Sequence, residues 1–231
     1  MVVQGDGFRV SLYRFAWLVA RTFFALCPMQ VIGHEKVPKS GAAVLAANHV
    51  SYLDPPAIGC ALRRECWFVA KAELFTLPVL GPLLPHLHAF PVRRGTADRT
   101  AIRRCVELLG EGKLVTVFPE GTRSPDGRLM KAEPGIGIIA LWARVPVVPV
   151  ALTGTDRALP RHSPFLRPAP ITVRIGDPLT FDDLRAEWRD REAVEEVGRR
   201  VMEAIGNLLA KDNPGAVPAG LLTGSGGSDE R

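Results

Sequence analysis

Residues 42–56, A42-A-V-L-A-A-N-H-V-S-Y-L-D-P-P56, join a strand signal, a turn and a helix signal. The segment 42–47 is uniformly apolar, which is typical of a strand that is buried on both faces. Asp54 and the two prolines after it predict a helix that reaches about residue 62, because proline is tolerated in the first helical turn. This stretch predicts an α/β domain.

The same alternation of strand and helix signals continues along the chain. Short apolar runs predict further strands at residues 29–33, 66–70, 89–92, 114–118, 147–152 and 171–175. Apolar residues at helical spacing predict helices over 98–109 and 135–143, and a long charged helix from a cap at 180–183 to Lys211. Prolines interrupt the apolar segment 76–88, so we expect irregular turns there. Together these elements predict a mixed, largely parallel central sheet flanked by helices.

The composition is that of a globular protein with a substantial core. Of the 231 residues, 47% are hydrophobic, which is enough for one large domain, expected over residues 29–212. The formal net charge of +5 favours an anionic partner such as nucleic acid, an acidic lipid surface or a phosphorylated substrate. The four cysteines have neither C-x-x-C nor metal-ligand spacing, as expected for free thiols in a reducing compartment.

The two ends of the chain differ from this central part. Residues 8–26 are largely apolar, but Arg14 and Arg21 fall about 20° apart on a helical wheel and form a narrow cationic stripe. This predicts an N-terminal amphipathic helix within residues 1–28 that lies in the membrane interface. We therefore expect a peripheral or monotopic protein on the cytoplasmic face of the cell membrane. The alternative is an amphipathic helix that packs on its own domain. The segment 213–231 is rich in Gly, Pro and Ser, which predicts a disordered tail.

His49 and Asp54 form the first candidate for catalysis. Their spacing of five residues would turn them about 140° apart on an ideal helix, but the pattern places them across a turn. A tight turn can return the carboxylate to one imidazole nitrogen and leave the other free to accept a proton. The alternative is that Asp54 only caps the following helix and His49 is an ordinary loop histidine.

A second group of polar residues follows other predicted strands. F118-P-E-G-T-R-S124 places Glu120, Gly121, Thr122 and Arg123 beyond the end of a buried strand, where ligands of α/β domains bind. The planar donor fork of arginine suits phosphate. F90-P-V-R-R-G95 places Arg93 and Arg94 at another strand end, and the apolar run V145-P-V-V-P-V150, which includes Pro149, could line an acyl channel.

These four blocks, in this order, resemble the glycerolipid acyltransferase family, and within it the 1-acyl-sn-glycerol-3-phosphate acyltransferases. The resemblance covers roughly residues 30 to 155. Asn48 to Asp54 resembles the first block of the family, and 92–94 the second, with Arg94 at the family's arginine. The segments 118–124 and 145–150 resemble the third and fourth. Arg93 is a departure, because many members carry an acidic or polar residue there.

The resemblance implies an acyl transfer in which no cofactor or metal takes part. His49 would be the general base and Asp54 would orient it. The acceptor site would be formed by Asn48, Arg93, Arg94, Glu120, Gly121, Thr122, Arg123 and Pro149. The family's reaction moves a fatty acyl group from acyl-CoA or acyl carrier protein to lysophosphatidic acid, giving phosphatidic acid. The implied partners are these substrates and the membrane phospholipid surface.

Several alternatives remain open at this point. The acceptor could be glycerol-3-phosphate or another lysophospholipid, and a non-enzymatic reading is a basic lipid-binding module at a membrane surface. Ser51 near His49 suggests a serine hydrolase, but the G-x-S-x-G elbow is missing. Nucleic acid is disfavoured because the basic residues are scattered. The basic connector 157–167 could contact lipid headgroups, although a solvated loop is its default reading.

Overall fold

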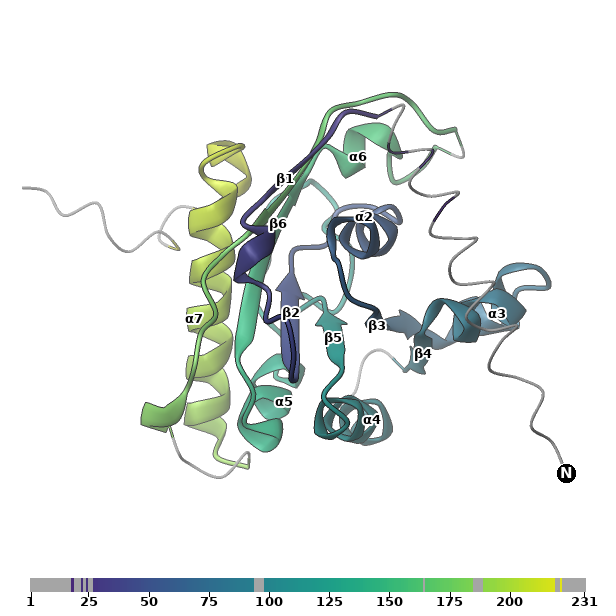
Figure 1. The fold of residues 1–231 in the computed structure, drawn as a ribbon. Coiled ribbons are helices and arrows are strands. Elements are labelled where there is room, and N and C mark those ends of the chain that lie inside the picture. The colour runs from purple at the N-terminus through teal and green to yellow at the C-terminus, as the bar shows by residue number, and fades with distance from the viewer. Residues whose placement is uncertain are drawn as a thin grey trace, which may run out of the picture.

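The computed structural model describes residues 18, 22, 24, 27–93, 98–163, 165–184, 189–218 and 221. Within them the chain forms the expected α/β fold, with a mixed and mostly parallel sheet flanked by helices (Figure 1). Most of the predicted N-terminal amphipathic helix lies outside the described residues. None of the described helices is both long enough and apolar enough to cross a membrane.

Seven strands of the described residues form one sheet in the order β1-β7-β6-β2-β5-β3-β4. Strands β2, β3, β4, β5 and β6 run parallel to one another, while β7 is antiparallel to β6 and pairs in parallel with β1. Their bounds are β1 Met29–Ile32, β2 Ala43–Ala47, β3 Cys66–Lys71, β4 Ala89–Val92, β5 Leu114–Val117, β6 Val147–Thr153 and β7 Ile171–Ile175. The predicted strands are all present, with ends that differ by at most one residue.

Helices cover both faces of the sheet, so the core consists of two clusters, one on each face. The described α-helices are α2 Asp54–Ala61, α3 Leu80–Leu83, α4 Arg99–Gly110, α5 Gly135–Ala143, α6 Thr155–Ala158 and α7 Arg191–Leu209. One core cluster lies between the sheet and α2, and the other between the sheet and α4, α5 and α7 (Figure 1). The proline-broken segment 76–88 forms short turns around α3, as expected.

Strand β2 lies at the centre of the sheet and is buried along its whole length. Leu45 and Ala47 face the α2 side, while Val44 and Ala46 face the other side, as the alternation of side chains along a strand requires. The prediction of a strand buried on both faces is confirmed. Because β2, β5 and β6 are parallel neighbours, their carboxyl ends meet at one edge of the sheet.

Two boundaries differ by several residues from those predicted. The last helix begins at Arg191, not at 180–183, because the Asp190 side chain accepts hydrogen bonds from the N–H groups of Glu192 and Ala193 and caps it there. The segment 213–218, expected to begin the disordered tail, packs on the domain. Ala216 is buried, and its carbonyl accepts a hydrogen bond from the N–H of Leu129 over 2.8 Å. The tail beyond it lies outside the described residues, except for residue 221.

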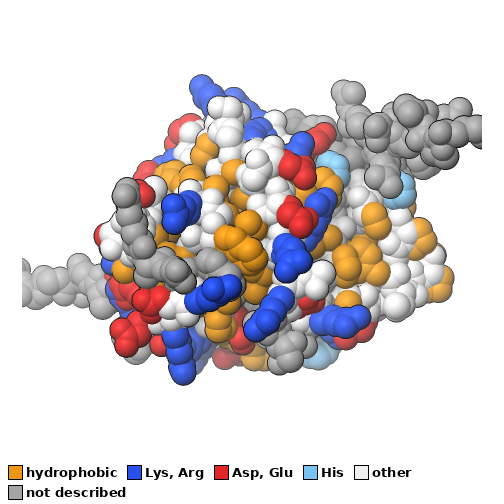
Figure 2. All heavy atoms as spheres, turned by 90° about the horizontal axis from the view of Figure 1, so that it is seen from below, with side chains coloured by type: hydrophobic (Ala, Val, Ile, Leu, Met, Phe, Trp, Pro, Cys, Tyr) orange, Lys and Arg blue, Asp and Glu red, His pale blue; other side chains and the backbone are white. Residues whose placement is uncertain are grey.

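Charged side chains of both signs are mixed on the face covered by α4 and α5. Figure 2 shows Lys and Arg interleaved with Asp and Glu on this side of the molecule. A continuous basic surface, which nucleic acid would require, is not seen in this view. The net positive charge is therefore not gathered on this face.

Candidate active site

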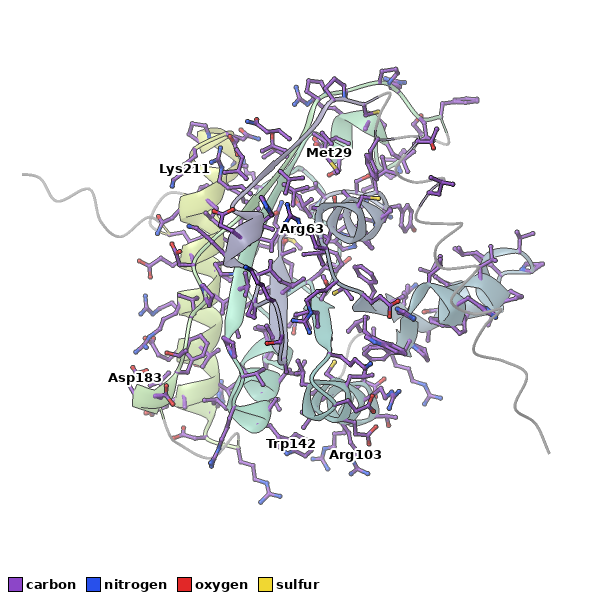
Figure 3. The ribbon with its side chains drawn as sticks, viewed as in Figure 1. Met29, Arg63, Arg103, Trp142, Asp183 and Lys211 are labelled. Atoms are coloured by element: carbon purple, nitrogen blue, oxygen red, sulfur yellow. The ribbon has the colours of Figure 1, made fainter. Side chains whose placement is uncertain are left out.

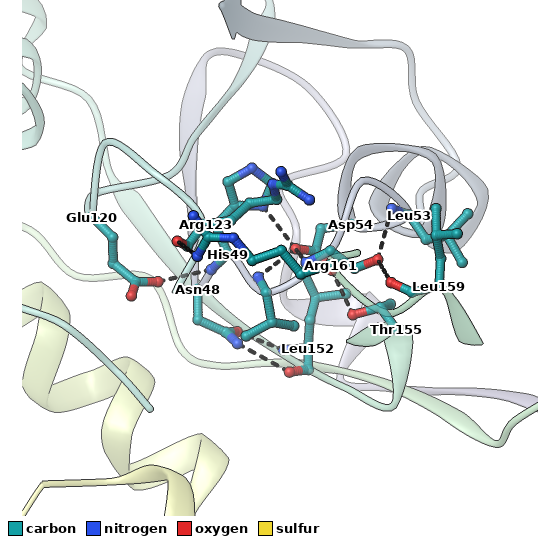
Figure 4. Close-up of polar contacts among 12 residues, drawn as sticks. Asn48, His49, Leu53, Asp54, Glu120, Arg123, Leu152, Thr155, Leu159 and Arg161 are labelled. Carbon is teal, nitrogen blue, oxygen red and sulfur yellow. Dashed lines mark hydrogen bonds and ion pairs between the residues drawn. The ribbon is translucent and has the colours of Figure 1, made fainter. Parts of the chain in front are cut away.

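His49 and Asp54 contact each other across the turn between β2 and α2. The distance from His49 Nδ1 to Asp54 Oδ2 is 2.7 Å (Figure 4). Asp54 is fully buried, and His49 is 7% exposed. The turn therefore joins the imidazole to the carboxylate, in the arrangement expected from their spacing.

The Asp54 carboxylate is held from several directions. Oδ2 accepts hydrogen bonds from the N–H groups of Val50 (2.7 Å) and Ser51 (2.8 Å), and Oδ1 accepts one from the hydroxyl of Thr155 (2.5 Å). Both N–H groups precede the helix, whose N-cap residue is Leu53. The alternative in which Asp54 only caps α2 is therefore wrong, because its oxygens are directed back to the turn.

These bonds decide the tautomer of His49. An ionised carboxylate only accepts hydrogen bonds, so Nδ1 of the neutral ring carries the proton that Asp54 receives. Nε2 is then an acceptor, and no described residue makes a hydrogen bond to it. The ring of Phe118 stacks on the imidazole with 4.1 Å between centroids. The imidazole is thus fixed in plane and orientation, with one basic nitrogen available.

Glu120 ties the His49 turn to the loop after β5. Its Oε1 accepts a hydrogen bond from the N–H of His49 (2.7 Å), and its Oε2 accepts one from the N–H of Met130 (3.0 Å). The N–H of Ser124 donates to the carbonyl of His49 over 2.7 Å. Glu120 is 3% exposed, and both oxygens are occupied by backbone groups. This differs from the ligand contact that the family resemblance implies, and makes Glu120 a positioning residue.

Burial raises the pKa of Glu120 to about 7, although the N–H groups of His49 and Met130 favour its charged form; the charge of Asp54 raises it further. In the unfolded chain a glutamate titrates near 4.3, so the folded state binds this proton more tightly. We expect the free energy of unfolding to fall as pH rises from about 4.5 to about 7, by a Glu120 contribution of about 3 kcal/mol.

Urea unfolding of the wild type and Glu120→Gln across this pH range measures that contribution. Gln keeps the volume of the side chain but does not titrate. The difference in unfolding free energy between the two proteins should therefore change with pH in the stated direction. Parallel pH profiles for the two proteins would contradict the raised pKa.

Asn48 and Gly121 also have structural roles here. The Asn48 side chain donates from Nδ2 to the Leu152 carbonyl (3.0 Å) and accepts at Oδ1 from the Leu152 N–H (2.7 Å). It thereby extends the pairing of β2 with β6 beyond the last strand residue. Gly121 has a φ of 67°, in the left-handed region that favours glycine. A Cβ there would also approach Glu133 Cγ to 3.0 Å. Thr122 is exposed in the same loop.

The predicted phosphate-binding arginines are only partly brought together. Arg123 is half-buried, and its guanidinium lies 3.6 Å from the centroid of the Tyr52 ring, which places it over the turn between His49 and Asp54. Arg93 is exposed after β4, and its backbone N–H donates to Asp98 Oδ2 over 2.8 Å. Arg94 lies outside the described residues. The structure therefore assigns Arg123 to the neighbourhood of His49.

Pro149 does not belong to this cluster. It is buried in β6, between Val147 and Ala151 in the alternation that faces α7. A Cβ at Gly176 would meet both Pro149 Cγ and the α7 residue Leu208. The His49 ring stacks on Phe118, which packs on the α2 side. Strand β6 is therefore a buried strand of the sheet, and Pro149 points away from His49 and Asp54.

Sequence reasoning missed Thr155, and it disfavoured Ser51 as a nucleophile. Thr155 is fully buried and follows β6 after Gly154, so the rule that sites form at strand ends could have singled it out. Ser51 is also fully buried, and its hydroxyl donates to the Leu159 carbonyl over 2.9 Å. Ser51 holds a neighbouring segment and does not contact His49 as a nucleophile would, which removes the basis of the hydrolase alternative.

Comparison with known proteins gives the class to which this fold and site belong. The sequence model of the family described as Acyltransferase matches residues 28–153, which is more than half of the chain. The chain therefore belongs to the acyltransferase family.

Particular relatives carry more specific names. The chain is 35% identical over 151 residues to a chloroplastic 1-acyl-sn-glycerol-3-phosphate acyltransferase of Brassica napus, covering 64% of this chain and 44% of the relative. It is 29% identical over 184 residues to the 1-acyl-sn-glycerol-3-phosphate acyltransferase of Bacillus subtilis, covering 78% of this chain and 89% of that relative. The crystal structure of the 1-acyl-sn-glycerophosphate (LPA) acyltransferase of Thermotoga maritima matches with a TM-score of 0.67 and 29% identity, covering 87% of this chain and 83% of that one. The chain spans about two fifths to just over half of the length of the first plant relatives.

Proposed function

We propose that this protein transfers a fatty acyl group from acyl-CoA or acyl carrier protein to the free hydroxyl of 1-acyl-sn-glycerol-3-phosphate, giving phosphatidic acid. The names of its relatives support this assignment. The observation that carries it is the His49–Asp54 pair, whose imidazole is oriented by a buried carboxylate and keeps one nitrogen without a described partner. That is the arrangement of a general base and its orienting acid.

The reaction follows from this geometry. His49 Nε2 accepts the proton of the acceptor hydroxyl while its oxygen attacks the carbonyl carbon of the thioester. A tetrahedral oxyanion forms, the C–S bond then breaks, and the imidazolium returns the proton to the leaving thiolate. Asp54 stabilises the imidazolium through its bond to Nδ1. Both substrates bring their reactive groups with them, so positioning and base catalysis suffice without a covalent acyl-enzyme.

Arg123 is the proposed ligand of the acceptor's phosphate. Its planar fork of donors suits phosphate oxygens, and its stacking on Tyr52 holds it beside the catalytic turn. Arg93 and Arg94 are proposed as further contacts with this phosphate. Because the acceptor carries an acyl chain, it would reach the protein from a membrane. We propose accordingly that the protein acts at the cytoplasmic face of the cell membrane as a peripheral protein, attached through residues 1–28.

A panel of acceptors tests the proposal. Purified protein is supplied with one acyl-CoA or acyl carrier protein and, in turn, lysophosphatidic acid, glycerol-3-phosphate and a lysophosphodiester. Lysophosphatidic acid should give the highest kcat/KM. A faster reaction with either of the other acceptors would reject the specific acceptor and keep the acyl transfer. No acylation of any acceptor with either donor would reject the enzyme.

Thr155→Val should lower kcat by about tenfold or more with little change in KM, because it removes a charge-assisted hydrogen bond to Asp54 worth about 1.5–3 kcal/mol. Val has nearly the volume of Thr, so packing changes little. Thr155→Ser is the matched control: it restores the hydroxyl and should recover most of kcat. Equal losses in both variants would mean that Thr155 acts through packing and not through its hydroxyl.

A further inference from the structure

The connector after β6 is hydrogen-bonded at one point to the His49 turn and at a second point to the loop that carries Arg123. The buried hydroxyl of Ser51, inside the turn, donates to the carbonyl of Leu159 over 2.9 Å. Nη1 of Arg161 donates to the carbonyl of Arg123 over 3.2 Å (Figure 4). These contacts join segments that are 108 and 38 residues apart in the sequence. The connector is thus a fixed part of the site's surroundings, and not a separate solvated loop.

This attachment brings two guanidinium groups to the same loop without a counter-ion. Within the described residues, neither Arg123 nor Arg161 forms an ion pair with a carboxylate, whereas other arginines such as Arg174 and Arg200 do. Two cations held at neighbouring positions repel each other and attract an anion. Arg161 donates one N–H to the Arg123 carbonyl, and its other N–H groups stay available to bind an anion.

The ring of Tyr52 restricts the position of the Arg123 guanidinium. Tyr52 is 55% exposed, and the Arg123 guanidinium lies over its ring at 3.6 Å. Stacking of this kind fixes the plane of the guanidinium and leaves its edge donors free. Because Tyr52 lies between His49 and Asp54 in the turn, the position of Arg123 is coupled to that of the dyad.

We propose that Arg161 is an additional phosphate-binding residue, which together with Arg123 selects a phosphomonoester over a phosphodiester, while Tyr52 is the platform that orients Arg123. This inference rests on the proposed function. A phosphomonoester carries about −1.5 to −2 charges near neutral pH and presents three terminal oxygens. A phosphodiester carries a single charge on two such oxygens. A second guanidinium therefore stabilises the monoester more than the diester.

The test compares Arg161→Ala with the wild type on two soluble acceptors of equal acyl length, short-chain lysophosphatidic acid and short-chain lysophosphatidylglycerol. We expect KM for the monoester to rise about tenfold with kcat nearly unchanged, and KM for the diester to change less than about threefold. Arg161→Lys, which keeps the charge but not the fork, should be intermediate.

Arg103→Ala is the matched control for the loss of one positive charge. Arg103 is exposed on α4, at the opposite end of the molecule from α6 (Figure 3). It should leave both KM values unchanged. Equal increases for the two acceptors in Arg161→Ala, or an effect of the same size in Arg103→Ala, would overturn the selective role of Arg161.

Two variants test the platform. Tyr52→Phe keeps the ring and should retain the wild-type KM for lysophosphatidic acid. Tyr52→Leu removes the ring and should raise this KM about two- to fivefold, as expected for an exposed cation–π contact. If Tyr52→Phe behaves like Tyr52→Leu, or if Tyr52→Leu behaves like the wild type, the ring does not position Arg123.

A final experiment tests whether Arg161 binds the phosphate of the acceptor or the phosphates of a membrane surface. Sedimentation with vesicles of phosphatidylglycerol and phosphatidylcholine should be the same for the wild type and Arg161→Ala. Weaker sedimentation with an unchanged KM would overturn the inference and assign Arg161 to headgroups. A wild type that acylates no phosphomonoester would reject the proposed function along with it, whereas an active enzyme indifferent to Arg161→Ala would reject the inference alone.

Discussion

His49→Ala is expected to lower kcat for the proposed acyl transfer by about 10²–10⁴-fold, the usual contribution of a positioned general base. The imidazole is the group whose Nε2 faces no described partner while Asp54 holds Nδ1 at 2.7 Å. KM should change little, because His49 is proposed to act on the reacting hydroxyl and not on the phosphate. Steady-state rates with lysophosphatidic acid and one acyl donor measure the effect.

Ser51→Ala is the matched control for this experiment. Ser51 lies in the same turn, but its hydroxyl donates to the Leu159 carbonyl. The same hydroxyl accepts a hydrogen bond from the Leu53 N–H over 3.3 Å. We expect a loss of kcat of less than about tenfold, because neither bond contacts His49 and each neutral hydrogen bond contributes about 0.5–1.5 kcal/mol to stability. A collapse in Ser51→Ala with an active His49→Ala would contradict the general-base mechanism and favour a serine nucleophile.

Vesicle sedimentation of His49→Ala separates the enzyme from a lipid-binding module. Binding to vesicles should remain at the wild-type level while acyl transfer is lost. A protein that binds vesicles but has no acyl transfer to lose, in either form, would be a membrane-surface module.

Asp54→Asn is expected to have the second largest effect, a loss of kcat of about 10²–10⁴-fold. The carboxylate accepts hydrogen bonds from two backbone N–H groups, the Thr155 hydroxyl and His49. An amide has one oxygen and one NH₂ group, so at least one of these donors would face another donor. The ring of His49 would then lose its tautomer, its orientation or both. Steady-state kinetics measure the loss.

The same substitution should reduce stability, which gives an independent readout. A buried donor left without an acceptor costs about 1–3 kcal/mol, and urea unfolding measures this cost. Thr155→Val is the useful comparison, because it removes one donor and leaves the carboxylate in place. If Asp54→Asn retains kcat within about tenfold of the wild type, the carboxylate is not the orienting group.

The parts of the site that could be predicted from the sequence are those that local chemistry specifies. His49 and Asp54 are five residues apart, between an apolar strand and a proline-started helix, so a turn was the arrangement that could join them. Glu120 to Arg123 follow an apolar run, and parallel neighbours bring their ends to one edge. These predictions required only the strand and helix pattern, together with a family resemblance for the roles.

Contacts between distant segments could not be predicted in this way. Thr155 reaches Asp54 across 101 residues, and Glu120 reaches the His49 N–H across 71. The alternation of side chains in β6 turns Pro149 toward α7. From its place in the apolar run 145–150, Pro149 was expected to line an acyl channel. The start of α7 was placed at 180–183 because that segment also carries aspartates that could cap a helix, and only the folded chain shows that Asp190 is the cap.

The sequence by itself determined an α/β chain, a histidine and an aspartate joined by a turn, and the loop that carries Arg123. These follow from periodicity and short spacings, which act within a few residues. The tertiary structure alone decided that Glu120 holds the backbone of the turn, that Thr155 holds Asp54, and that Arg161 is hydrogen-bonded to the Arg123 loop. The physical reason is that a hydrogen bond acts over about 3 Å. Which distant groups come within that distance depends on the order and register of the strands.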